Sequence, residues 1–505
     1  MKGSVKAVMY VPERQEFCSL ALKGDLIPIY REVLADRLTP VSAFERLTAG
    51  EEGSLSFLLE SVVGGERVRR YSFLGYRPAQ VFQSKGQRVT LTEDGVEREF
   101  ELKPGEDPLT LLKVMMHQYR YIPMPGLPSF CGGAVGFLGY DIVRFFEKLP
   151  DTNPDELEVE DAYFLFTDTL LIFDHVKRRM KILCNAPVDG DPGEAYDLAI
   201  SKIEEVIARL RTPTPPPAAE PPRAPRKIEV KHCFPREDYE AAVERCRQYI
   251  LAGDAFQIVL AQRFEVEFTA PPFDLYRALR SVNPSPYMFY FSLGDRKLIG
   301  SSPETLASVE GKVATLRPIA GSRPRGANEV EDARLEKELL DDAKEVSEHI
   351  MLVDLSRNDL GRVCEYGSIY VNELMVVEKY SHIMHIVSDV KGKMAAGKDE
   401  FDLLRSAFPH GTVSGAPKVR AMEIIDEEET TRRGFYAGCA GYFSYSGDMD
   451  MAISLRTMMT KGNTAYLQAG GGLVADSVPA TEYQECINKA KALVTAIELA
   501  ELGLE

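Results

Sequence analysis

A Pro-rich segment at residues 211–226 is the feature that most constrains how this chain folds. It reads RTPTPPPAAEPPRAPR. Proline fixes φ and lacks a backbone N–H, so this stretch cannot form the interior of a helix or of a central strand and is expected to run extended as a spacer. At 505 residues the chain is long enough for two or three domains. We therefore expect a domain at 1–210, a linker at 211–226 and a second domain at 227–505.

Apolar patterning on either side of this segment predicts sheets covered by helices. Before it, short apolar runs such as YFLFTDTLLIFD alternate with turn residues, and a helix is expected at about 193–210. After it, a helix at 238–253 precedes strands at YMFYFSL, KLIGSS, LASVEG and KVATLRP, and a β meander runs from GFYAGCAGYFSYSG to NTAYLQAGGGLVADS. Helices at about 330–355 and 479–499 frame this meander. Since strands and helices do not alternate regularly, the predicted class is α+β with antiparallel sheets.

Charge and cysteine content exclude several classes of protein. A net charge of −17 argues against a nucleic-acid partner, which requires clustered Lys and Arg. The 8 cysteines include no C-x-x-C pair, so neither a disulfide framework nor a structural zinc is indicated. The N-terminus lacks the apolar core of a signal peptide, and no stretch approaches the roughly 20 apolar residues of a membrane span. We expect a cytoplasmic protein with no nucleic-acid or membrane partner.

The expected helix at 330–355 carries Glu345 and Glu348, which lie three residues apart and share a helix face. A solvated acidic face is the ordinary interpretation of such a pair. Leu352 and Leu355, however, continue the stripe of Glu348, so this helix is apolar on several sides and should be buried on several sides. An ionised carboxylate near an interior must be paired or must coordinate a metal.

The expected helix at 479–499 repeats this arrangement with Glu482 and Glu485. An ordinary i, i+4 ion pair between Glu485 and Lys489 explains this helix when it is taken alone. Two acidic helices in one chain, without His or Cys partners, favour a hard cation such as Mg²⁺. Sequence spacing does not establish that the two helices meet.

Several other features are suited to an anionic ligand. GTVSGAPK at 411–418 lacks the G-K-[ST] of a nucleotide P-loop, but a Gly-rich turn before a helix presents backbone N–H groups to a carboxylate. The GGG at 470–472 lets a ligand approach the backbone closely, although a structural turn explains either motif equally well. Arg456, in the apolar run AISLRTMM, requires a counter-anion from the protein or a ligand. His385 also lies in an apolar strand, where a histidine is more often a core residue than a catalyst.

Taken together, these segments resemble the chorismate-binding enzymes. The likeness runs in order over about residues 234–499 and includes PIAGSRPRG, DAKEVSEHIMLVDLSRNDLGRV, HIMHIVSDV, PHGTVSGAPKVRAMEIID, GYFSYSGDMDMAISLRT, QAGGGLVADSVP and EYQECINKA. In the N-terminal part, LLES at 58–61 and RYSFLG at 70–75 look like anthranilate synthase large subunits. The resemblance implies a two-domain α+β sandwich of antiparallel β-sheets flanked by helices, with the active site in the chorismate-binding domain. It also implies the conversion of chorismate and ammonia to anthranilate and pyruvate, the first step of tryptophan biosynthesis.

The same resemblance assigns roles to individual residues. Glu348 and Glu485 are expected to bind Mg²⁺ directly, with Glu345 and Glu482 close by. Glu304, in SSPET, and His385 match the acid/base residues of the family, with Thr412 beside them. Chorismate is expected to contact Gly321, Ser322, Thr412, Tyr436, Arg456, Gly470, Gly471, Gly472 and Lys489.

Two positions separate the related activities. Isochorismate and salicylate synthases of the family carry a lysine base that activates water, and this sequence has Gln257 there, which favours ammonia as the nucleophile. Aminodeoxychorismate synthases often have a nucleophilic lysine within PIKGT, where this chain has PIAGS with Ala320. Aminodeoxychorismate synthase is nevertheless the nearest alternative activity. A catalytically inactive tryptophan-sensing or scaffold subunit is another alternative, but the acids, His385, Arg456 and Lys489 are all present.

The resemblance also implies two partners. No segment resembles a glutaminase with a nucleophilic cysteine in a Gly-rich elbow, so a separate glutaminase subunit is expected to supply ammonia. LLES and NPSPYMF resemble the family's L-tryptophan feedback site. The residues expected to bind L-tryptophan as an inhibitor are Glu60, Ser61, Pro286, Tyr287, Met288, Gly441 and Tyr442.

Overall fold

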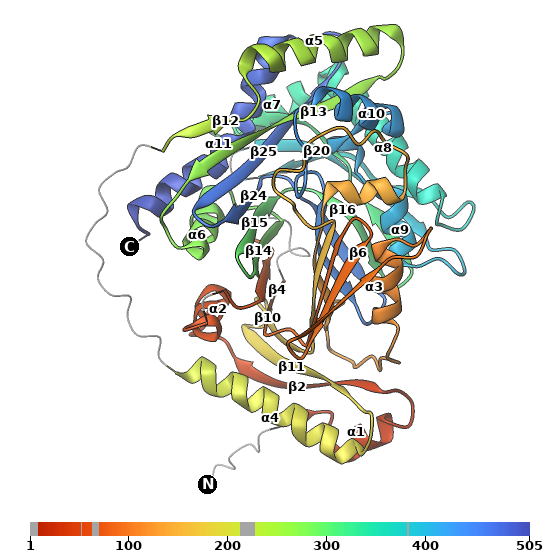
Figure 1. Ribbon diagram of the computed structural model, residues 1–505, viewed down its shortest axis with the longest axis vertical. Coiled ribbons are helices and arrows are strands. Elements are labelled where there is room, and N and C mark those ends of the chain that lie inside the picture. Colours follow the sequence, from red (N-terminus) through yellow and green to blue (C-terminus); the bar gives the residue numbers. More distant parts are fainter. Residues whose placement is uncertain (1–8, 52, 63–69, 213–227, 381–382, 505) are drawn as a thin grey trace.

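Two large β-sheets form the centre of the molecule (Figure 1). The computed structural model describes residues 9–51, 53–62, 70–212, 228–380 and 383–504. The named strands pair in antiparallel fashion. This arrangement confirms the predicted class of antiparallel sheets flanked by helices.

The first sheet has 13 strands. In spatial order they are β1 (Tyr10–Val11), β2 (Leu26–Leu34), β11 (Arg179–Pro187), β10 (Thr169–Asp174), β4 (Tyr71–Tyr76), β3 (Ser56–Glu60), β14 (Tyr287–Leu293), β15 (Arg296–Ser302), β24 (Thr457–Lys461), β25 (Thr464–Leu473), β13 (Gln257–Glu267) and β12 (Val230–His232), with β21 (Gly415–Ala416) paired to β13.

The second sheet has 12 strands. In spatial order they are β18 (Ile319–Pro324), β20 (Ile383–Lys393), β17 (Val313–Leu316), β16 (Thr305–Glu310), β23 (Met449–Ile453), β22 (Cys439–Ser444), β8 (Gly133–Leu138), β9 (Ala162–Thr167), β5 (Gln80–Lys85), β6 (Arg88–Glu93) and β7 (Val96–Glu101), with β19 (Tyr370–Lys379) paired to β20.

Helices cover the outer faces of both sheets (Figure 1). Those packed on the first sheet or on its covering helices are α1 (Arg14–Leu20), α2 (Pro40–Thr48), α4 (Pro192–Arg211), α5 (Arg236–Ala252), α6 (Pro272–Val282), α10 (Lys418–Glu428) and α11 (Pro479–Leu502). Those packed on the second sheet or on its covering helices are α3 (Pro108–Met116), α7 (Glu329–Asp341), α8 (Ala343–Gly361) and α9 (Glu400–Ala407). Two 3₁₀ helices, η1 (Tyr140–Phe145) and η2 (Gly411–Val413), complete the set.

Each sheet contains strands from both sides of the Pro-rich segment. In the first sheet β3 pairs with β14, and in the second β8 pairs with β22. The sequence segments before and after the expected linker therefore do not form separate sheets. The linker itself falls mainly on residues 213–227, which lie outside the described residues.

The central strands are buried on both faces. In β10, Leu170 and Ile172 join the core between the sheets, whereas Leu171 and Phe173 join the core beneath the helices of the first sheet. Strands buried in this way read as continuous apolar runs, which is the pattern of TLLIFD.

Two local expectations are wrong. The helix expected at 330–355 is interrupted at Asp342, whose side chain accepts hydrogen bonds from the backbone N–H groups of Lys344 and Glu345 and so begins α8 as a new helix. A short acidic side chain competes in this way for free N–H groups at a helix start. Arg456 does not lie within a strand, because it adopts a left-handed φ of +46° between β23 and β24.

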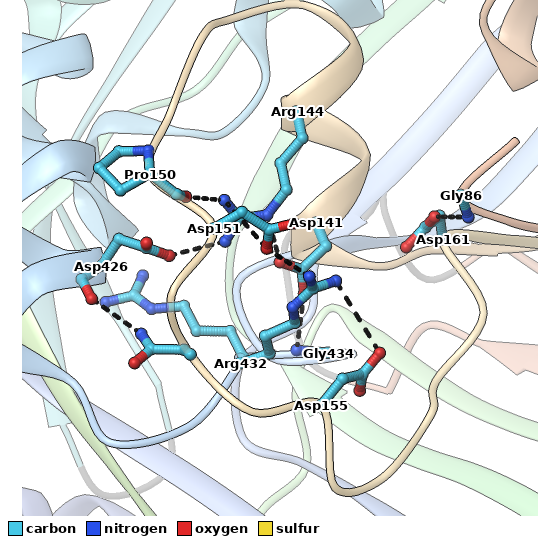
Figure 2. A network of polar contacts seen from close by, with 12 residues as sticks. Gly86, Asp141, Arg144, Pro150, Asp151, Asp155, Asp161, Asp426, Arg432 and Gly434 are labelled. Carbon is cyan, nitrogen blue, oxygen red and sulfur yellow. Dashed lines mark hydrogen bonds and ion pairs between the residues drawn. The ribbon is translucent and has the colours of Figure 1, made fainter.

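A polar network joins η1 and the segment after it to α10 (Figure 2). Arg144 donates to Asp141 at 3.0 Å and to Asp426 of α10 at 2.7 Å, and Asn153 donates to the Asp426 carbonyl at 3.0 Å. This network anchors the residues that follow the GTVSGAPK turn against the N-terminal part of the chain. Within the described residues, no helix is long and apolar enough to cross a membrane.

Candidate active site

The acidic helices α8 and α11 pack against different sheets. Helix α8 packs against β18 and β20 of the second sheet, and α11 packs against β25 of the first. The sequence predicted α11 at about 479–499, and the structure has Pro479–Leu502 with proline in the first turn, where its missing N–H costs nothing.

Residues at the ends of β13 and β25 connect the two acidic pairs. The Gln257 amide donates to Glu348 of α8 at 2.8 Å. Gln257 also fills the space beside Gly472, because a Cβ on that glycine would lie 2.4 Å from the Gln257 amide nitrogen. A Cβ on Gly471 would lie 3.1 Å from Glu482 Oε2 and 3.8 Å from Glu485 Oε1. The GGG segment thus lies beside the acids of α11 at Gly471 and beside Gln257, which contacts Glu348 of α8, at Gly472.

Burial and like charge disfavour the ionised form of one acid on each of these two helices. Burial, followed by the charge of Glu348, raises the pKa of Glu345. Burial also raises the pKa of Glu482, the Ser477 hydrogen bond opposes this, and the charge of Glu485 adds to it. The buried Oε2 of Glu482 has no hydrogen-bond partner among the residues that the structure describes. In the part of the chain that the structure describes, no group of three or more His, Cys, Asp or Glu side chains is placed so that it could hold a metal ion.

Basic residues satisfy part of this negative charge. Lys489 lies 2.7 Å from Glu485, which is the i, i+4 pair considered from the sequence, and it also donates to the Gly470 carbonyl at 2.9 Å. Arg323 lies 3.4 Å from Glu345. Lys489 therefore stands between the acids and the Gly-rich strand end.

Glu304 is a buried carboxyl in the turn between β15 and β16. The Thr412 hydroxyl, at the Gly-rich turn, donates to Glu304 Oε1 at 2.8 Å. Burial raises the pKa of Glu304 to about 8, against the opposing effects of Thr412, the Ile319 backbone, Arg456 and Lys489. The carboxyl is therefore neutral near pH 7 and carries a proton that it can donate.

Arg456 is a partly buried cation that interacts electrostatically with this carboxyl. Burial lowers its pKa, and the charge of Glu304 acts in the opposite direction. Its one polar contact in the described chain is a long hydrogen bond of 3.5 Å to Asn283, and no described carboxylate forms an ion pair with it. Since guanidinium stays protonated, its charge is available for a ligand carboxylate.

His385 lies on β20 opposite Ser322 of β18. Its Nδ1 is 2.9 Å from the Gly321 carbonyl oxygen. Because a carbonyl only accepts, Nδ1 carries the proton and Nε2 keeps a lone pair. Burial lowers the pKa of His385 to about 4, against the opposing effect of the Gly321 hydrogen bond. The ring is thus a neutral acceptor and not an acid near pH 7.

Tyr436 and the Gly-rich turn are held by a buried ion pair. Tyr436 is fully buried and hydrogen-bonds the Gly470 backbone. Arg433 pairs with Glu429 at 2.6 Å, and it donates to the carbonyls of Val413 at 2.6 Å and Val259 at 2.7 Å. The pair fixes the turn that carries Thr412 against β13.

The residues expected to bind L-tryptophan lie on or beside the paired strands β3 and β14 of the first sheet and on β22 of the second sheet. Glu60 pairs with Met288, and its carboxylate accepts from Tyr276 at 2.7 Å and Arg280 at 2.9 Å on the helix side. The buried Ser61 hydroxyl has no hydrogen-bond partner among the described residues.

Tyr287 reaches the second sheet, to which Gly441 and Tyr442 belong. The Tyr287 hydroxyl, next to Pro286, donates to Asp450 of β23 at 3.0 Å. In the strand register, Asp450 of β23 lies opposite Tyr442 of β22, the residue after Gly441. The Tyr442 ring stacks on Phe130 at 4.3 Å.

The structure adds residues that the motifs did not single out. Asn283 contacts Arg456, Arg433 supports the Gly-rich turn, and His410 contacts Thr412. His410 is part of the PHGTVSGAPK segment, so its position beside a Gly-rich turn was the one available signal. No sequence motif marks Asn283 or Arg433, because their contacts depend on the direction that the folded chain gives to their side chains.

Comparison with known proteins identifies the family. A family model described as chorismate binding enzyme matches residues 57–495. The chain therefore belongs to the chorismate-binding enzyme family. Within that family it is 46% identical to anthranilate synthase component 1 of Acetivibrio thermocellus, over 97% of this chain and 99% of that protein. It is 47% identical to anthranilate synthase component 1 of Pseudomonas aeruginosa, over 97% of this chain and 100% of that protein.

Solved structures agree with this placement. The crystal structure of anthranilate synthase component I from Streptococcus pneumoniae TIGR4 matches with a TM-score of 0.74 at 37% identity, covering 91% of this chain and 98% of that chain. The menaquinone-specific isochorismate synthase MenF from Escherichia coli shares the fold, with a TM-score of 0.69 at 19% identity over 96% of this chain and 100% of that chain.

Proposed function

We propose that this chain is the chorismate-converting component of an anthranilate synthase. It converts chorismate and ammonia to anthranilate, pyruvate and water, a step of tryptophan biosynthesis. The observation that carries this proposal is a neutral buried carboxyl, Glu304, that interacts electrostatically with Arg456, a partly buried cation without a carboxylate partner among the described residues. A dicarboxylate substrate with a poor hydroxyl leaving group requires both.

Substrate binding follows from the charges in the site. Arg456 would hold the enolpyruvyl carboxylate, because its guanidinium has no carboxylate partner among the described residues. Lys489 and the backbone of Gly470, Gly471 and Gly472 would lie at the ring carboxylate. Gly321, Ser322 and Tyr436 would line the remaining surface, since they flank His385 and Gly470.

The proton transfers can then be assigned to side chains of this chain. Glu304 donates its proton to the 4-hydroxyl of chorismate, which leaves as water while ammonia forms a bond to C2. The Glu304 carboxylate then takes a proton back from the new ammonium group, while the His385 Nε2 lone pair would accept a hydrogen bond from the substrate. The C2 proton moves to the enolpyruvyl methylene as the C3–O bond breaks, so that pyruvate leaves and the ring becomes aromatic. Each proton is accounted for, and Glu304 returns to its starting form.

The acidic residues fit a hard cation such as Mg²⁺. All donors are carboxylates, two of them have a raised pKa, and the buried Glu482 Oε2 lacks a partner. Glu348 and Glu485 would hold the ion, with Glu345 and Glu482 close by. When bound, Mg²⁺ supplies positive charge that neutralises the ring carboxylate of the substrate.

A separate glutaminase subunit would supply the ammonia. Six thiols of this chain are buried, and burial raises the pKa of each, which makes them poor nucleophiles. They are Cys131, Cys184, Cys246, Cys364, Cys439 and Cys486. We expect the purified chain to use ammonium and not glutamine as the nitrogen donor.

L-Tryptophan would bind where β3 meets β14 and inhibit the enzyme. The buried, unpartnered Ser61 hydroxyl and the stacked Tyr442 ring support a site for a small aromatic ligand there. Glu60, Pro286, Tyr287, Met288 and Gly441 complete the proposed site.

A fluorescence assay for anthranilate tests this function directly. The purified chain receives chorismate, Mg²⁺ and ammonium, with and without L-tryptophan, and parallel samples receive glutamine in place of ammonium. We expect anthranilate from ammonium alone, and less of it when L-tryptophan is present. Formation of 4-amino-4-deoxychorismate without anthranilate would instead indicate the alternative activity, aminodeoxychorismate synthase.

Replacing Arg456 by Gln tests the assignment of the substrate cation. Loss of a charge-assisted contact is expected to raise KM for chorismate about 10- to 100-fold. Arg456→Lys keeps the positive charge but lacks the planar guanidinium, so its KM for chorismate should lie between those of the unaltered chain and of Arg456→Gln. Steady-state kinetics measure both variants, and an unchanged KM in Arg456→Gln would place the carboxylate elsewhere.

Replacing Glu348 by Ala tests the metal assignment. We expect at least a tenfold weaker apparent affinity for Mg²⁺, measured by titration calorimetry of the free protein and by activation of catalysis. Asp354→Ala is a matched control, because Asp354 lies on the same helix with its carboxylate exposed. Equal Mg²⁺ binding by the two variants would contradict Glu348 as a ligand.

A further inference from the structure

His410 is a buried histidine that no step above uses, and it lies directly beside the acid. Only 3% of the His410 surface is exposed to solvent. Its Nδ1 accepts from the Thr412 backbone N–H at 3.3 Å and lies 2.8 Å from the Thr412 hydroxyl. The same Nδ1 is 3.5 Å from Glu304 Oε1. His410, Thr412 and Glu304 therefore form one contiguous cluster.

The backbone contact fixes the tautomer of His410. A backbone N–H only donates, so Nδ1 of His410 is an acceptor, and the proton of the neutral ring sits on Nε2. Burial and the nearby charge of Lys418 lower the pKa of His410 to about 3. The ring stays neutral over the range in which the enzyme would work, and its lone pair faces the Thr412 hydroxyl.

Two acceptors consequently compete for one proton. The Thr412 hydroxyl has a single hydrogen, and both His410 Nδ1 and Glu304 Oε1 lie 2.8 Å from its oxygen. When this hydrogen points to Glu304, it stabilises the carboxylate. When it points to His410, the oxygen of Thr412 is left to accept a hydrogen bond from a protonated Glu304.

We propose that His410 is a positioning residue for the acid: by accepting the Thr412 hydroxyl hydrogen, it favours the protonated form of Glu304. This inference rests on the proposed role of Glu304 and adds a residue to that site. His410 does not touch the substrate in this proposal and acts only through Thr412.

Other charged or titratable groups face the acid from neighbouring elements. The charges of Arg456 and Lys489 favour the ionised form of Glu304, and the charge of Glu304 in turn raises the pKa of Tyr380. Lys418 faces His410, and neutral His385 lies near Arg456 and Lys489. A substitution at position 410 replaces none of these groups. A matched pair of substitutions there therefore distinguishes the effect of the His410 acceptor atom from that of the neighbouring charges.

The experiment compares His410→Leu with His410→Asn. Leu fills a similar volume without an acceptor, whereas Asn places an amide oxygen near the position of Nδ1 and can still cap η2. The measured quantities are the pH profile of kcat with ammonium and chorismate, and the pH at which the carboxylic acid infrared band of Glu304 disappears. Loss of that band in Glu304→Gln assigns it.

In His410→Leu, we expect the alkaline limb of kcat and the infrared transition to move together to lower pH by about half to one unit. In His410→Asn, both should stay within a few tenths of a unit of the original. An unmoved infrared transition in folded His410→Leu would overturn the proposal, as would an equal shift in both variants. If the infrared transition moves but the kcat limb does not, His410 positions the Glu304 proton and the role of Glu304 as acid is wrong.

Discussion

Glu304→Gln is expected to lower kcat by about 10²- to 10⁴-fold, the usual contribution of a positioned general acid. The Gln side chain keeps the size and can still accept from Thr412, but it has no proton to give to the leaving hydroxyl. Because Glu304 contacts Thr412 and not Arg456 directly, KM for chorismate should change little. Steady-state kinetics with ammonium measure both constants. A variant that keeps more than a tenth of kcat would contradict the assignment.

The pH dependence gives an independent check on the same group. With a pKa raised to about 8 by burial, Glu304 is protonated below that pH and ionised above it. Turnover should therefore fall as pH rises through about 8, and this limb should be absent from Glu304→Gln.

The pH dependence of folding stability should also reflect the protonation of Glu304. The folded chain holds it up to about pH 8, whereas the unfolded chain releases it near about pH 4.3. Between these values the unfolded state binds fewer protons, so this carboxyl lowers stability by up to about 1.4 kcal/mol per pH unit as pH rises. Stability of Glu304→Gln should thus fall less steeply between about pH 5 and 7, which denaturant titration measures.

The acidic pairs show how far a sequence pattern can specify a site. Spacing placed Glu345 with Glu348 and Glu482 with Glu485 on helix faces, and the structure has helices over all of these residues. Spacing carries no information on whether α8 and α11 approach each other, because they pack on different sheets. That depends on strand order, which brings β13 and β25 side by side and lets Gln257 reach Glu348.

The fold was predictable in class and less so in connectivity. Alternation and turn residues indicated antiparallel sheets, as observed. The Pro-rich segment suggested a division that the sheets do not follow, because β3 with β14 and β8 with β22 pair across it. Such pairings join residues far apart in sequence, and local propensity does not encode them.

Single side chains depend on tertiary context most strongly. The sequence required a counter-anion for Arg456 and placed it in a strand, but its left-handed backbone turns it out of the ladder toward Asn283. The raised pKa of Glu304 results from burial among the elements around it, so it has no signature in SSPET.

Arg433→Met is expected to destabilise the folded chain by about 3–5 kcal/mol, because it leaves the buried Glu429 carboxylate without its cation. Arg433 and Glu429 are both almost fully buried, and Glu429 also accepts from the Ala261 backbone N–H at 2.9 Å. The substitution further removes the hydrogen bond to the Val413 carbonyl, next to Thr412. Denaturant titration measures the loss, and kcat should fall in the surviving folded protein because the turn is released.

Two comparison variants separate charge burial from loss of bulk. The neighbouring Arg432 pairs with Asp151, whose side chain is 58% exposed, so Arg432→Met should cost only about 0–1 kcal/mol. Combining Arg433→Met with Glu429→Leu removes both buried charges and should recover much of the stability lost in the single variant. Recovery of stability without recovery of kcat is the expected outcome, because the double variant still lacks the donor that holds the Val413 carbonyl and, through it, the Thr412 hydroxyl near Glu304. If kcat recovered with stability, the ion pair would serve folding alone.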